Sequence, residues 1–321
     1  MIFIEKLAEG MNVSGIYLVK TMNQATTKTG KTYYNLILQD KTGMVDAKIW
    51  EPNSPGIDDF EALDYVDITG QVISFNNALQ VNIRRARKAR DNEYDPSDYL
   101  PSTDKDAGEL FRQVLVYVDS VKNPYLNKLL NRFFREDAEF AKRFQSGSAA
   151  KTVHHGFIGG LMEHTVSVTR LCDYFAQYYP LLKRDLLITA ALLHDIGKTR
   201  ELAPFPKNDY TDDGQMLGHI MIGAEMIHDA AKEIEGFPAV LESELKHCIL
   251  AHHGELEYGS PKKPALAEAM ALNLADNADA RLETMTELFH NNVTRKTPWL
   301  GYNKLLESNV RRTTEIEAEE E

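Results

Sequence analysis

The chain has 321 residues, of which 43% are hydrophobic and 26% are charged, and its formal net charge is −12. This length predicts more than one domain, and the composition is that of a globular protein with a hydrophobic core. The acidic balance argues against passive coating of nucleic acid, and no apolar run is long enough to span a bilayer. Only Cys172 and Cys248 are present, outside any C-x-x-C pair, and no export signal is visible, so we expect a cytoplasmic protein with reduced thiols.

Residues 1–90 predict a five-stranded OB-type β-barrel. The short apolar or alternating runs that predict strands are 16–19, 33–38, 45–50, 65–73 and 79–83. Turn signals separate them, notably D-K-T-G at 40–43 and the pair Asn76-Asn77. Five short strands suit a small barrel, for which the OB fold is the economical choice. Residues 57–63 are the candidate for the helix that conventionally lies between the third and fourth strands.

Residues 91–107 are polar and acidic and contain two prolines, which predicts a linker. Apolar residues then recur about every 3.6 positions, so residues 108–292 predict an all-α domain. The expected helices are 110–121, 124–134, 161–178, 184–194, 219–234, 242–252 and 264–289. Residues 293–321 form a C-terminal segment that ends in a disordered acidic tail, EIEAEEE. The expected fold class is therefore α+β and multidomain, with a barrel followed by a helical domain.

Histidine and aspartate residues stand at the ends or on the faces of the predicted helices. They are His164, the pair His194-Asp195, His219, the pair His252-His253, and Asp276. Imidazole and carboxylate are the side chains that divalent transition metals accept. Asp195 follows the apolar run LLITAALL, where a buried charge needs cations or hydrogen-bond donors nearby. Any one of the ten histidines taken alone is more simply a packing or surface residue, so the combination carries the metal hypothesis.

Five motifs resemble, in order and spacing, the successive motifs of the HD phosphohydrolase superfamily. They are G-G-L-M-E-H-T from Gly159, H-D-I-G-K from His194, G-H-I from Gly218, H-H-G from His252 and A-D-N-A-D-A from Ala275. The preceding segment GKTYYNLILQDKTGMVDAKIW resembles the OB-type module of the YhaM-type 3′-to-5′ exoribonucleases. The resemblance to these enzymes extends from about residue 10 to about residue 290.

The resemblance implies a metal-dependent phosphodiesterase. The minimal metal set of the superfamily falls on His164, His194, Asp195 and Asp276, and the extra histidines of two-metal members fall on His219, His252 and His253. Asp195 would then bridge two divalent ions, with Mn²⁺ favoured over Fe or Co and a mononuclear site left open. Two such ions would acidify a water molecule, and the resulting hydroxide would attack phosphorus in line.

Other residues are candidates for contacts with the substrate inside the helical domain. Lys198 lies one helical turn after His194, so it is predicted to reach a non-bridging phosphate oxygen; the alternative is a solvated lysine near a helix end. His155 precedes the first metal helix, and contact with phosphate or sugar is weighed equally against structural capping. Asp279 could orient a ligand or substrate, or could instead lie on the surface or pair helices.

The barrel offers candidates for binding a single strand, because OB barrels combine aromatic platforms with a basic track. Tyr33 and Trp50 are the aromatic candidates, and either Tyr33 or its neighbour Tyr34 must face the core. The basic run RRARKAR is predicted to follow phosphates, against the alternative of a solvated charged face. The residues expected to contact phosphate are Arg84, Arg85 and Arg87.

Three functional readings follow. The leading one is a 3′-to-5′ exoribonuclease that degrades single-stranded RNA, with single-stranded DNA as a second candidate, to nucleoside 5′-monophosphates; direction and product are implied by the resemblance. The second is an HD-type phosphohydrolase of nucleotides or cyclic dinucleotides with a regulatory barrel. The third is a nucleic-acid-binding adaptor with a catalytically dead helical domain, against which the intact ligand positions argue. Assembly into a homo-oligomer is compatible with the resemblance, and nothing in the sequence fixes it.

Overall fold

The structure, a computed structural model, describes residues 1–76, 78–100, 102–103, 105–151, 156–290, 292 and 297–314. It contains two compact units, of which the first is Met1–Ser102 and the second begins at Thr103. Within the described ranges, no helix combines the length and the apolar character needed to cross a bilayer.

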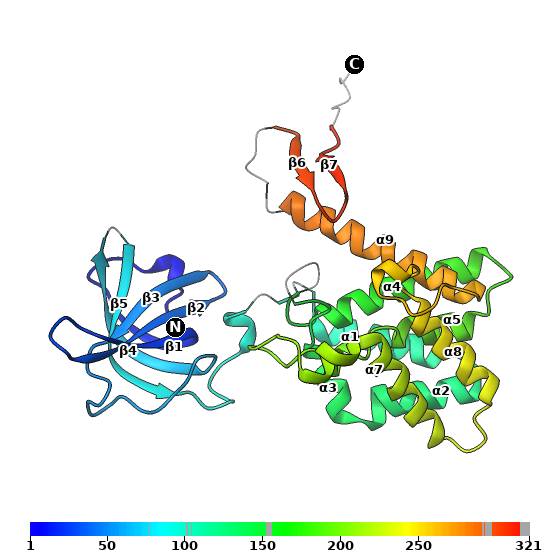
Figure 1. Cartoon of the computed structure of the whole chain (residues 1–321), viewed down its shortest axis with the longest axis horizontal. Helices are drawn as coiled ribbons and strands as arrows, with labels where there is room; N and C mark the ends of the chain where they lie inside the picture. The colour runs from blue at the N-terminus through cyan, green and yellow to red at the C-terminus, as the bar shows by residue number, and fades with distance from the viewer. Residues whose placement is uncertain are drawn as a thin grey trace. The chain divides into compact units, whose positions relative to one another are not determined.

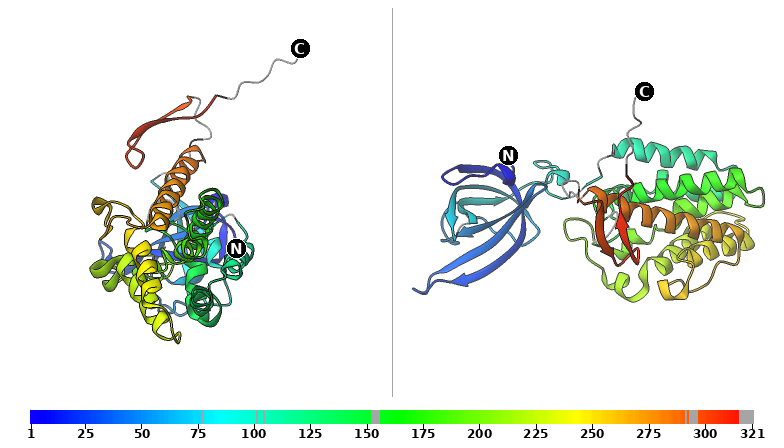
Figure 2. Two further views of the ribbon diagram at one scale, coloured as in Figure 1. Left: turned by 90° about the vertical axis from the view of Figure 1, so that its right-hand side faces the viewer. Right: turned by 90° about the horizontal axis from the view of Figure 1, so that it is seen from above.

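The first unit is a closed barrel of five strands (Figures 1 and 2). They are β1 (Asn12–Thr26), β2 (Thr32–Asp40), β3 (Gly43–Ile49), β4 (Tyr65–Phe75) and β5 (Ala78–Lys88). Their order around the barrel is β1-β2-β3-β5-β4, and β4 pairs with β1 to close it. Neighbouring strands are antiparallel except β3 and β5, which run parallel. This is the arrangement of an OB fold, so the predicted barrel is confirmed.

The segment between β3 and β4 corrects one expectation. We expected a helix at residues 57–63, but turns and extended chain occupy this stretch. Ile57 forms a parallel bridge with Ala86 of β5, and the backbone N–H of Asp58 donates to the Ala86 carbonyl at 2.8 Å. Phe60 is buried in the barrel core. The backbone is therefore hydrogen-bonded to a strand, which leaves it unable to form helical bonds.

Part of the stretch expected to be a linker is folded onto the barrel. Within residues 91–107, a short 3₁₀ helix (Pro96–Asp98) lies between Tyr94 and Tyr99. The ring of Tyr94 stacks on Tyr65 of β4 with centroids 3.9 Å apart, and Tyr99 meets the same ring edge-on at 5.0 Å. Tyrosine rings bury large apolar area, so these aromatic contacts favour a packed arrangement over an extended spacer.

The second unit is helical, as predicted. Its helices are α1 (Ala107–Ser120), α2 (Pro124–Asn131), α3 (Ala138–Ser146), α4 (Gly160–Tyr178), α5 (Arg184–Leu193), α6 (Lys198–Glu201), α7 (Asp212–Lys232), α8 (Ala239–Ala251) and α9 (Ala267–His290). Each expected helix is present, and a π-helical turn (Arg132–Glu136) continues α2. The short helices α3 and α6 were not predicted, because nine and four residues give few turns over which apolar residues can recur.

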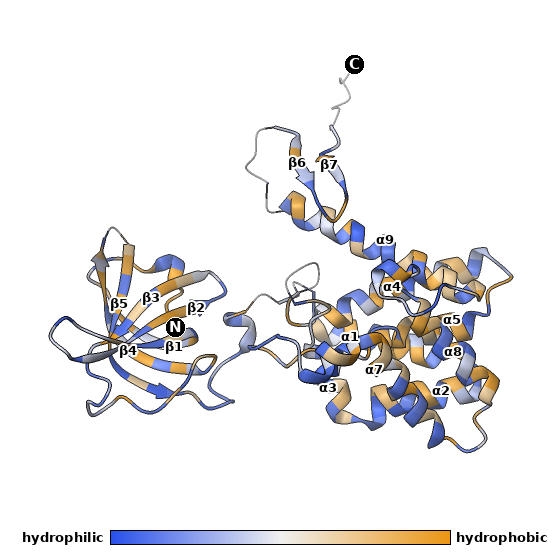
Figure 3. Ribbon diagram, viewed as in Figure 1, coloured by the Kyte–Doolittle hydropathy of each residue, from blue (hydrophilic) through white to orange (hydrophobic). Residues whose placement is uncertain are grey.

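Helix α5 lies at the centre of this unit. Every residue from Leu186 to Leu193 is buried, and α5 contacts α1, α2, α4, α8 and α9. A helix that is apolar on all sides has to be surrounded by others, and Figure 3 shows hydrophobic ribbon on α5 and on its neighbour α8. The residues that follow α5, His194 and Asp195, therefore lie in the protein interior.

A β-hairpin follows α9 and was not anticipated. It consists of β6 (Trp299–Asn303) and β7 (Ser308–Arg311), which pair in antiparallel fashion. The Arg312 guanidinium donates to the Phe289 carbonyl at the end of α9, at 3.0 Å. Residues 315–321, which contain the acidic end expected to be disordered, lie outside the described residues.

Candidate functional site

The H-D-I-G-K motif occupies the buried end of α5. His194 is the C-cap of α5, and the next residue, Asp195, is only 2% exposed. Gly197 allows α7 to approach, because a Cβ at this position would lie 2.0 Å from the His219 carbonyl oxygen. Gly218, with a φ of 72°, interrupts the helical geometry of α7 immediately before His219. Two glycines thus let His219 approach the buried aspartate.

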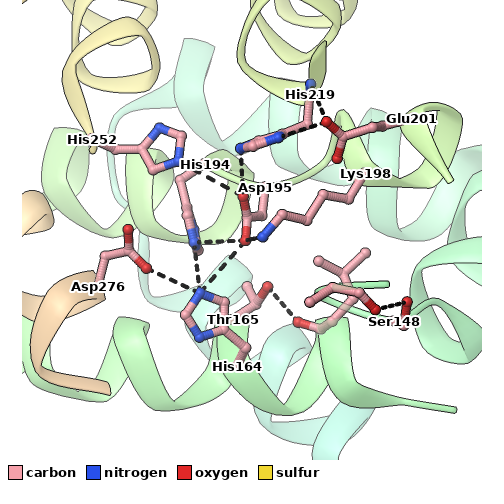
Figure 4. Close-up of polar contacts among 12 residues, drawn as sticks. Ser148, His164, Thr165, His194, Asp195, Lys198, Glu201, His219, His252 and Asp276 are labelled. Carbon is pink, nitrogen blue, oxygen red and sulfur yellow. Dashed lines mark hydrogen bonds and ion pairs between the residues drawn. The ribbon is translucent and has the colours of Figure 1, made fainter. Parts of the chain in front are cut away.

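One group of candidate ligands lies on the Oδ2 side of Asp195 (Figure 4). The Nε2 atoms of His164 and His194 are 3.2 Å apart, and they lie 3.5 and 3.3 Å from this oxygen. Asp276 Oδ1 is 3.1 Å from His164 Nε2. His164, His194 and Asp276 each offer one atom to a group whose members all lie within 4.8 Å of one another.

A second group lies on the Oδ1 side of Asp195. The Nε2 atoms of His219 and His252 are 3.5 and 3.7 Å from Oδ1. Together with His253, these histidines form another group with ligand atoms within 4.8 Å of one another. The two carboxylate oxygens of Asp195 therefore face two different sets of three side chains.

The five imidazoles are oriented by hydrogen bonds on their outer nitrogens. Each Nδ1–H donates to an oxygen: His194 to the Ala191 carbonyl (2.8 Å), His252 to the Ile249 carbonyl (2.6 Å), His253 to the Tyr258 carbonyl (2.8 Å), His219 to Glu201 Oε1 (3.0 Å) and His164 to Asp279 Oδ2 (2.7 Å). In this tautomer a neutral imidazole keeps the lone pair of Nε2 for a metal ion. At His164, Asp276 and Asp279 raise the pKa to about 10 against the effect of burial, so a metal ion at its Nε2 would have to displace a proton.

Charged groups close to Asp195 decide its ionisation state. Burial opposes its ionisation, but Lys198 and His194 hold the pKa of Asp195 well below its usual range. The Lys198 ammonium is 2.6 Å from Asp195 Oδ2 and its side chain is 14% exposed. Burial also disfavours the charged lysine, yet Asp195 raises the pKa of Lys198, so this residue stays cationic. Burial lowers the pKa of His252 and of His253, which favours the neutral, ligand-competent imidazole.

The donor set fits divalent cations. Among the described residues, the buried atoms Asp195 Oδ1, His219 Nε2 and His252 Nε2 have no hydrogen-bond partner. Buried polar atoms without partners are costly, and these three converge on one space from three elements. All three present lone pairs, because the protons of the two histidines are donated outward. A cation would satisfy them together, whereas another protein acceptor would not.

Two acidic residues support the histidines from outside the cluster. Asp279, one of the residues with two alternative readings, contacts His164 and also accepts a hydrogen bond from Ser167. Glu201 was not identified from the sequence; it is buried and accepts bonds from both the backbone N–H and the ring of His219. Its position in the four-residue helix α6 gives no periodic signal, so only the folded arrangement reveals it. His155 lies outside the described residues.

The barrel brings Tyr33 and Trp50 together. Their ring centroids are 5.0 Å apart, and the Lys48 ammonium lies 5.0 Å from the Tyr33 centroid and 5.6 Å from that of Trp50. Trp50 is 44% exposed, and its indole N–H donates to Asn82 of β5 at 3.1 Å. Tyr34, in contrast, packs against the barrel core. The pair therefore presents exposed aromatic surface beside a positive charge.

The three arginines of β5 differ in their surroundings. A register shift in the pairing of β4 with β5 lies between the partners of Ile83 and Arg85, and both Arg84 and Arg85 are exposed as a result. Arg87 departs from the expectation of a free phosphate contact, because its guanidinium is paired with Asp67 and Glu93, each at 2.8 Å. Its charge is already neutralised by these two carboxylates.

Known proteins place the chain in a family. A helical domain that gathers histidines and aspartates around an H-D pair defines an HD-domain hydrolase, and residues 161–281 match the HD domain family. The chain is 34% identical over 281 residues to the 3′-5′ exoribonuclease YhaM of Bacillus velezensis, covering 86% of this chain and 87% of that protein. The Bacillus licheniformis 3′-5′ exoribonuclease YhaM is 33% identical over the same shares. The chain belongs to the YhaM exoribonuclease family, which confirms the resemblance.

A solved structure similar to the barrel is the second OB-fold domain of replication protein A from Methanococcus maripaludis. It is 17% identical, covers 28% of this chain and 94% of that chain, and has a TM-score of 0.23.

Proposed function

We propose that the protein is a metal-dependent 3′-5′ exoribonuclease that shortens single-stranded RNA and releases nucleoside 5′-monophosphates. Membership of the YhaM family supports the reaction and its direction. The observation that carries the metal dependence is the position of Asp195 between two sets of three ligands, with unpartnered buried atoms on its Oδ1 side. The free, buried cysteines support a reducing compartment such as the cytoplasm.

The proposed centre holds two divalent cations. His164, His194 and Asp276 would hold one with Asp195 Oδ2, and His219, His252 and His253 would hold the other with Asp195 Oδ1. We propose Mn²⁺, with Fe and Co as the other candidates, because carboxylate ligands suit Mn²⁺ and imidazole ligands suit Fe. When bound, such ions supply Lewis acidity toward the phosphate and lower the pKa of water.

The remaining residues of the proposed site position these groups and bind the phosphate. Glu201 and Asp279 fix the ring orientation of His219 and His164 through hydrogen bonds of 3.0 and 2.7 Å. Lys198 carries a positive charge at the edge of the cluster, where its ammonium can donate to a non-bridging phosphate oxygen. The burial of His194 and Asp195 excludes bulk water from one side of the centre, which strengthens these electrostatic interactions.

For the barrel we propose binding of a single strand by Tyr33 and Trp50, with Lys48, Arg84 and Arg85 contacting phosphates. Stacking on aromatic rings needs no particular base, which suits an enzyme that degrades RNA of any sequence. Stacking also does not read the 2′-hydroxyl, so single-stranded DNA is a second proposed ligand. Arg87 is left out of this set because its charge is paired.

Digestion of RNA that is labelled at one end tests the proposed activity. With Mn²⁺ present, 5′-labelled RNA is expected to give a ladder of shortening products, and 3′-labelled RNA is expected to release a labelled mononucleotide at once. A chelator should stop both reactions. Hydrolysis of nucleotides or cyclic dinucleotides with no shortening of RNA would instead support the second reading, and tight RNA binding without turnover would support the adaptor.

Removing both platform rings, by Tyr33→Ala with Trp50→Ala, is expected to weaken RNA binding by about 10- to 100-fold. The basis is the loss of stacking for one base on the two adjoining rings, which contributes roughly this factor. Fluorescence anisotropy with chelated metal measures the affinity without turnover. Tyr174→Ala, on an exposed ring of α4, is the matched control. Equal affinities of the double variant and this control would refute the proposed platform, while hydrolysis of bis(p-nitrophenyl) phosphate should be the same in all three proteins.

A further inference from the structure

A cavity of about 420 Å³ opens beside the candidate metal cluster. His164, Lys198 and Asp276 form part of its lining, so the cavity reaches the proposed centre directly. Pockets for small ligands have volumes of roughly 300–1,000 Å³, and this one falls within that range. The volume is larger than a phosphate group needs, so the cavity has room for a further part of a ligand.

Part of the lining is apolar and comes from two separate elements. Leu305 and Leu306 belong to the turn of the β6–β7 hairpin, and Tyr258 ends the short 3₁₀ helix Leu256–Tyr258. Leu305 is 53% exposed and Tyr258 is 60% exposed, so both keep apolar surface free for a ligand. Exposed apolar side chains that converge on one pocket mark a binding surface more strongly than scattered ones.

The hairpin turn is held in place by local hydrogen bonds. Asn303 Oδ1 accepts bonds from the backbone N–H groups of Leu305 and Leu306, at 2.9 and 3.0 Å. This Asx-type arrangement fixes the turn, while Arg312 ties the end of the hairpin to the Phe289 carbonyl of α9. The two leucines therefore line the cavity from a turn that hydrogen bonds hold in place.

Helix α9 supplies the polar part of the same wall. Asn273, Asn277, Arg281 and Thr284 line the cavity at helical spacing, on the face of α9 that also carries Asp276. Within the part of the chain that the structure describes, no carboxylate pairs with the exposed Arg281 guanidinium. Its donors are available to a ligand that carries oxygen atoms beyond its phosphate.

We propose that this cavity seats the 3′-terminal nucleoside of the strand, an inference that rests on the proposed nuclease function. The phosphate of the terminal nucleotide lies at the cluster, the base packs against Leu305, Leu306 and Tyr258, and Arg281 donates to the ribose. Apolar packing carries no pattern of donors and acceptors that would select one base. The pocket therefore fits removal of any nucleotide from the end, and it makes the hairpin a substrate-binding element.

Binding of adenosine 5′-monophosphate and of inorganic phosphate to the full chain loaded with Mn²⁺ tests the proposal by calorimetry. The double variant Leu305→Ala with Leu306→Ala is expected to bind the nucleotide about tenfold more weakly, because it loses apolar contact with the base. Its affinity for inorganic phosphate should not change. Tyr258→Ala should act in the same direction, and it retains the backbone carbonyl that orients His253. Leu282→Ala, an exposed leucine of α9 outside the cavity lining, is the matched control.

Three results would refute the proposed nucleoside pocket. The first is that neither variant changes the affinity for the nucleotide, and the second is that the affinities for nucleotide and phosphate fall together. The third is that the wild-type protein binds phosphate as tightly as the nucleotide. Failure of the pocket can be distinguished from failure of the proposed nuclease function. Wild-type protein that shortens RNA, combined with variants that bind the nucleotide normally, refutes the pocket alone. Wild-type protein that shortens no RNA refutes the nuclease proposal, whatever the nucleotide affinity is.

Discussion

Replacing Asp195 with asparagine is expected to abolish RNA shortening, with a fall in turnover of at least about 10³-fold. In the proposed centre the cations, and not Asp195 itself, would stabilise the negative charge of the transition state, and losing one such stabilising group costs roughly 10²- to 10³-fold. Asp195 faces both candidate ligand sets, so its replacement would weaken the binding of both ions. Asparagine has the same shape but no charge. Its amide nitrogen would also point protons at an imidazole lone pair, on either the His164 side or the His219 side.

Metal analysis separates this explanation from a simple loss of folding. Wild-type protein should carry two ions per chain, and Asp195→Asn should carry fewer, with an unchanged far-ultraviolet circular dichroism spectrum. Asp213→Asn, at an exposed aspartate near the start of α7, should retain both the metal content and the activity. An Asp195→Asn protein that keeps two ions and normal turnover would exclude the bridging role.

The barrel could be predicted because its chemistry is local. Alternation along 33–38 and 45–50 places Leu36, Leu38 and Ala47 inside, and each of these residues is fully buried. The helix predicted at residues 57–63 was wrong, because the pattern of seven residues cannot reveal a hydrogen bond to a distant strand. That bond, from Asp58 to Ala86, is a tertiary contact.

The candidate ligands were also accessible from the sequence, since their residue types and motif spacing are distinctive. The division of these ligands into two groups, one on each oxygen of Asp195, could not be predicted from the sequence. Which oxygen of Asp195 faces which histidines depends on the close approach of α7 at Gly197 and on the break at Gly218. The role of Glu201 could not be predicted for a related reason. The partner that explains its burial, His219, is 18 positions away along the chain.

The cavity beside the cluster shows the same limit. Leu305 and Leu306 fall in a segment expected to be only a C-terminal extension, and no periodic pattern assigns them a role. Their importance comes from a turn fixed by Asn303 and from the cavity that they share with α9. Such convergence of separate elements is set by tertiary packing and has no local sequence signal.

Replacing Lys198 with glutamine is expected to lower kcat about 10²- to 10³-fold while leaving two metal ions per chain. Lysine has no lone pair to offer a metal when it is protonated, and Asp195 raises the pKa of Lys198, so the residue acts as a cation. Its expected partner in the working enzyme is a phosphate oxygen that gains charge during hydrolysis, and losing such a contact costs roughly this factor.

Single-turnover kinetics and metal analysis on the same preparations check this expectation. Lys232→Gln, on an exposed lysine at the end of α7, is the control. Lys198→Arg should recover part of the rate, because it keeps the charge but not the compact geometry of the ammonium. Unchanged kcat in Lys198→Gln would make the 2.6 Å contact with Asp195 a structural ion pair only. Loss of metal in that variant would instead make Lys198 a support for the bridging carboxylate, because the rate would then fall with the ions.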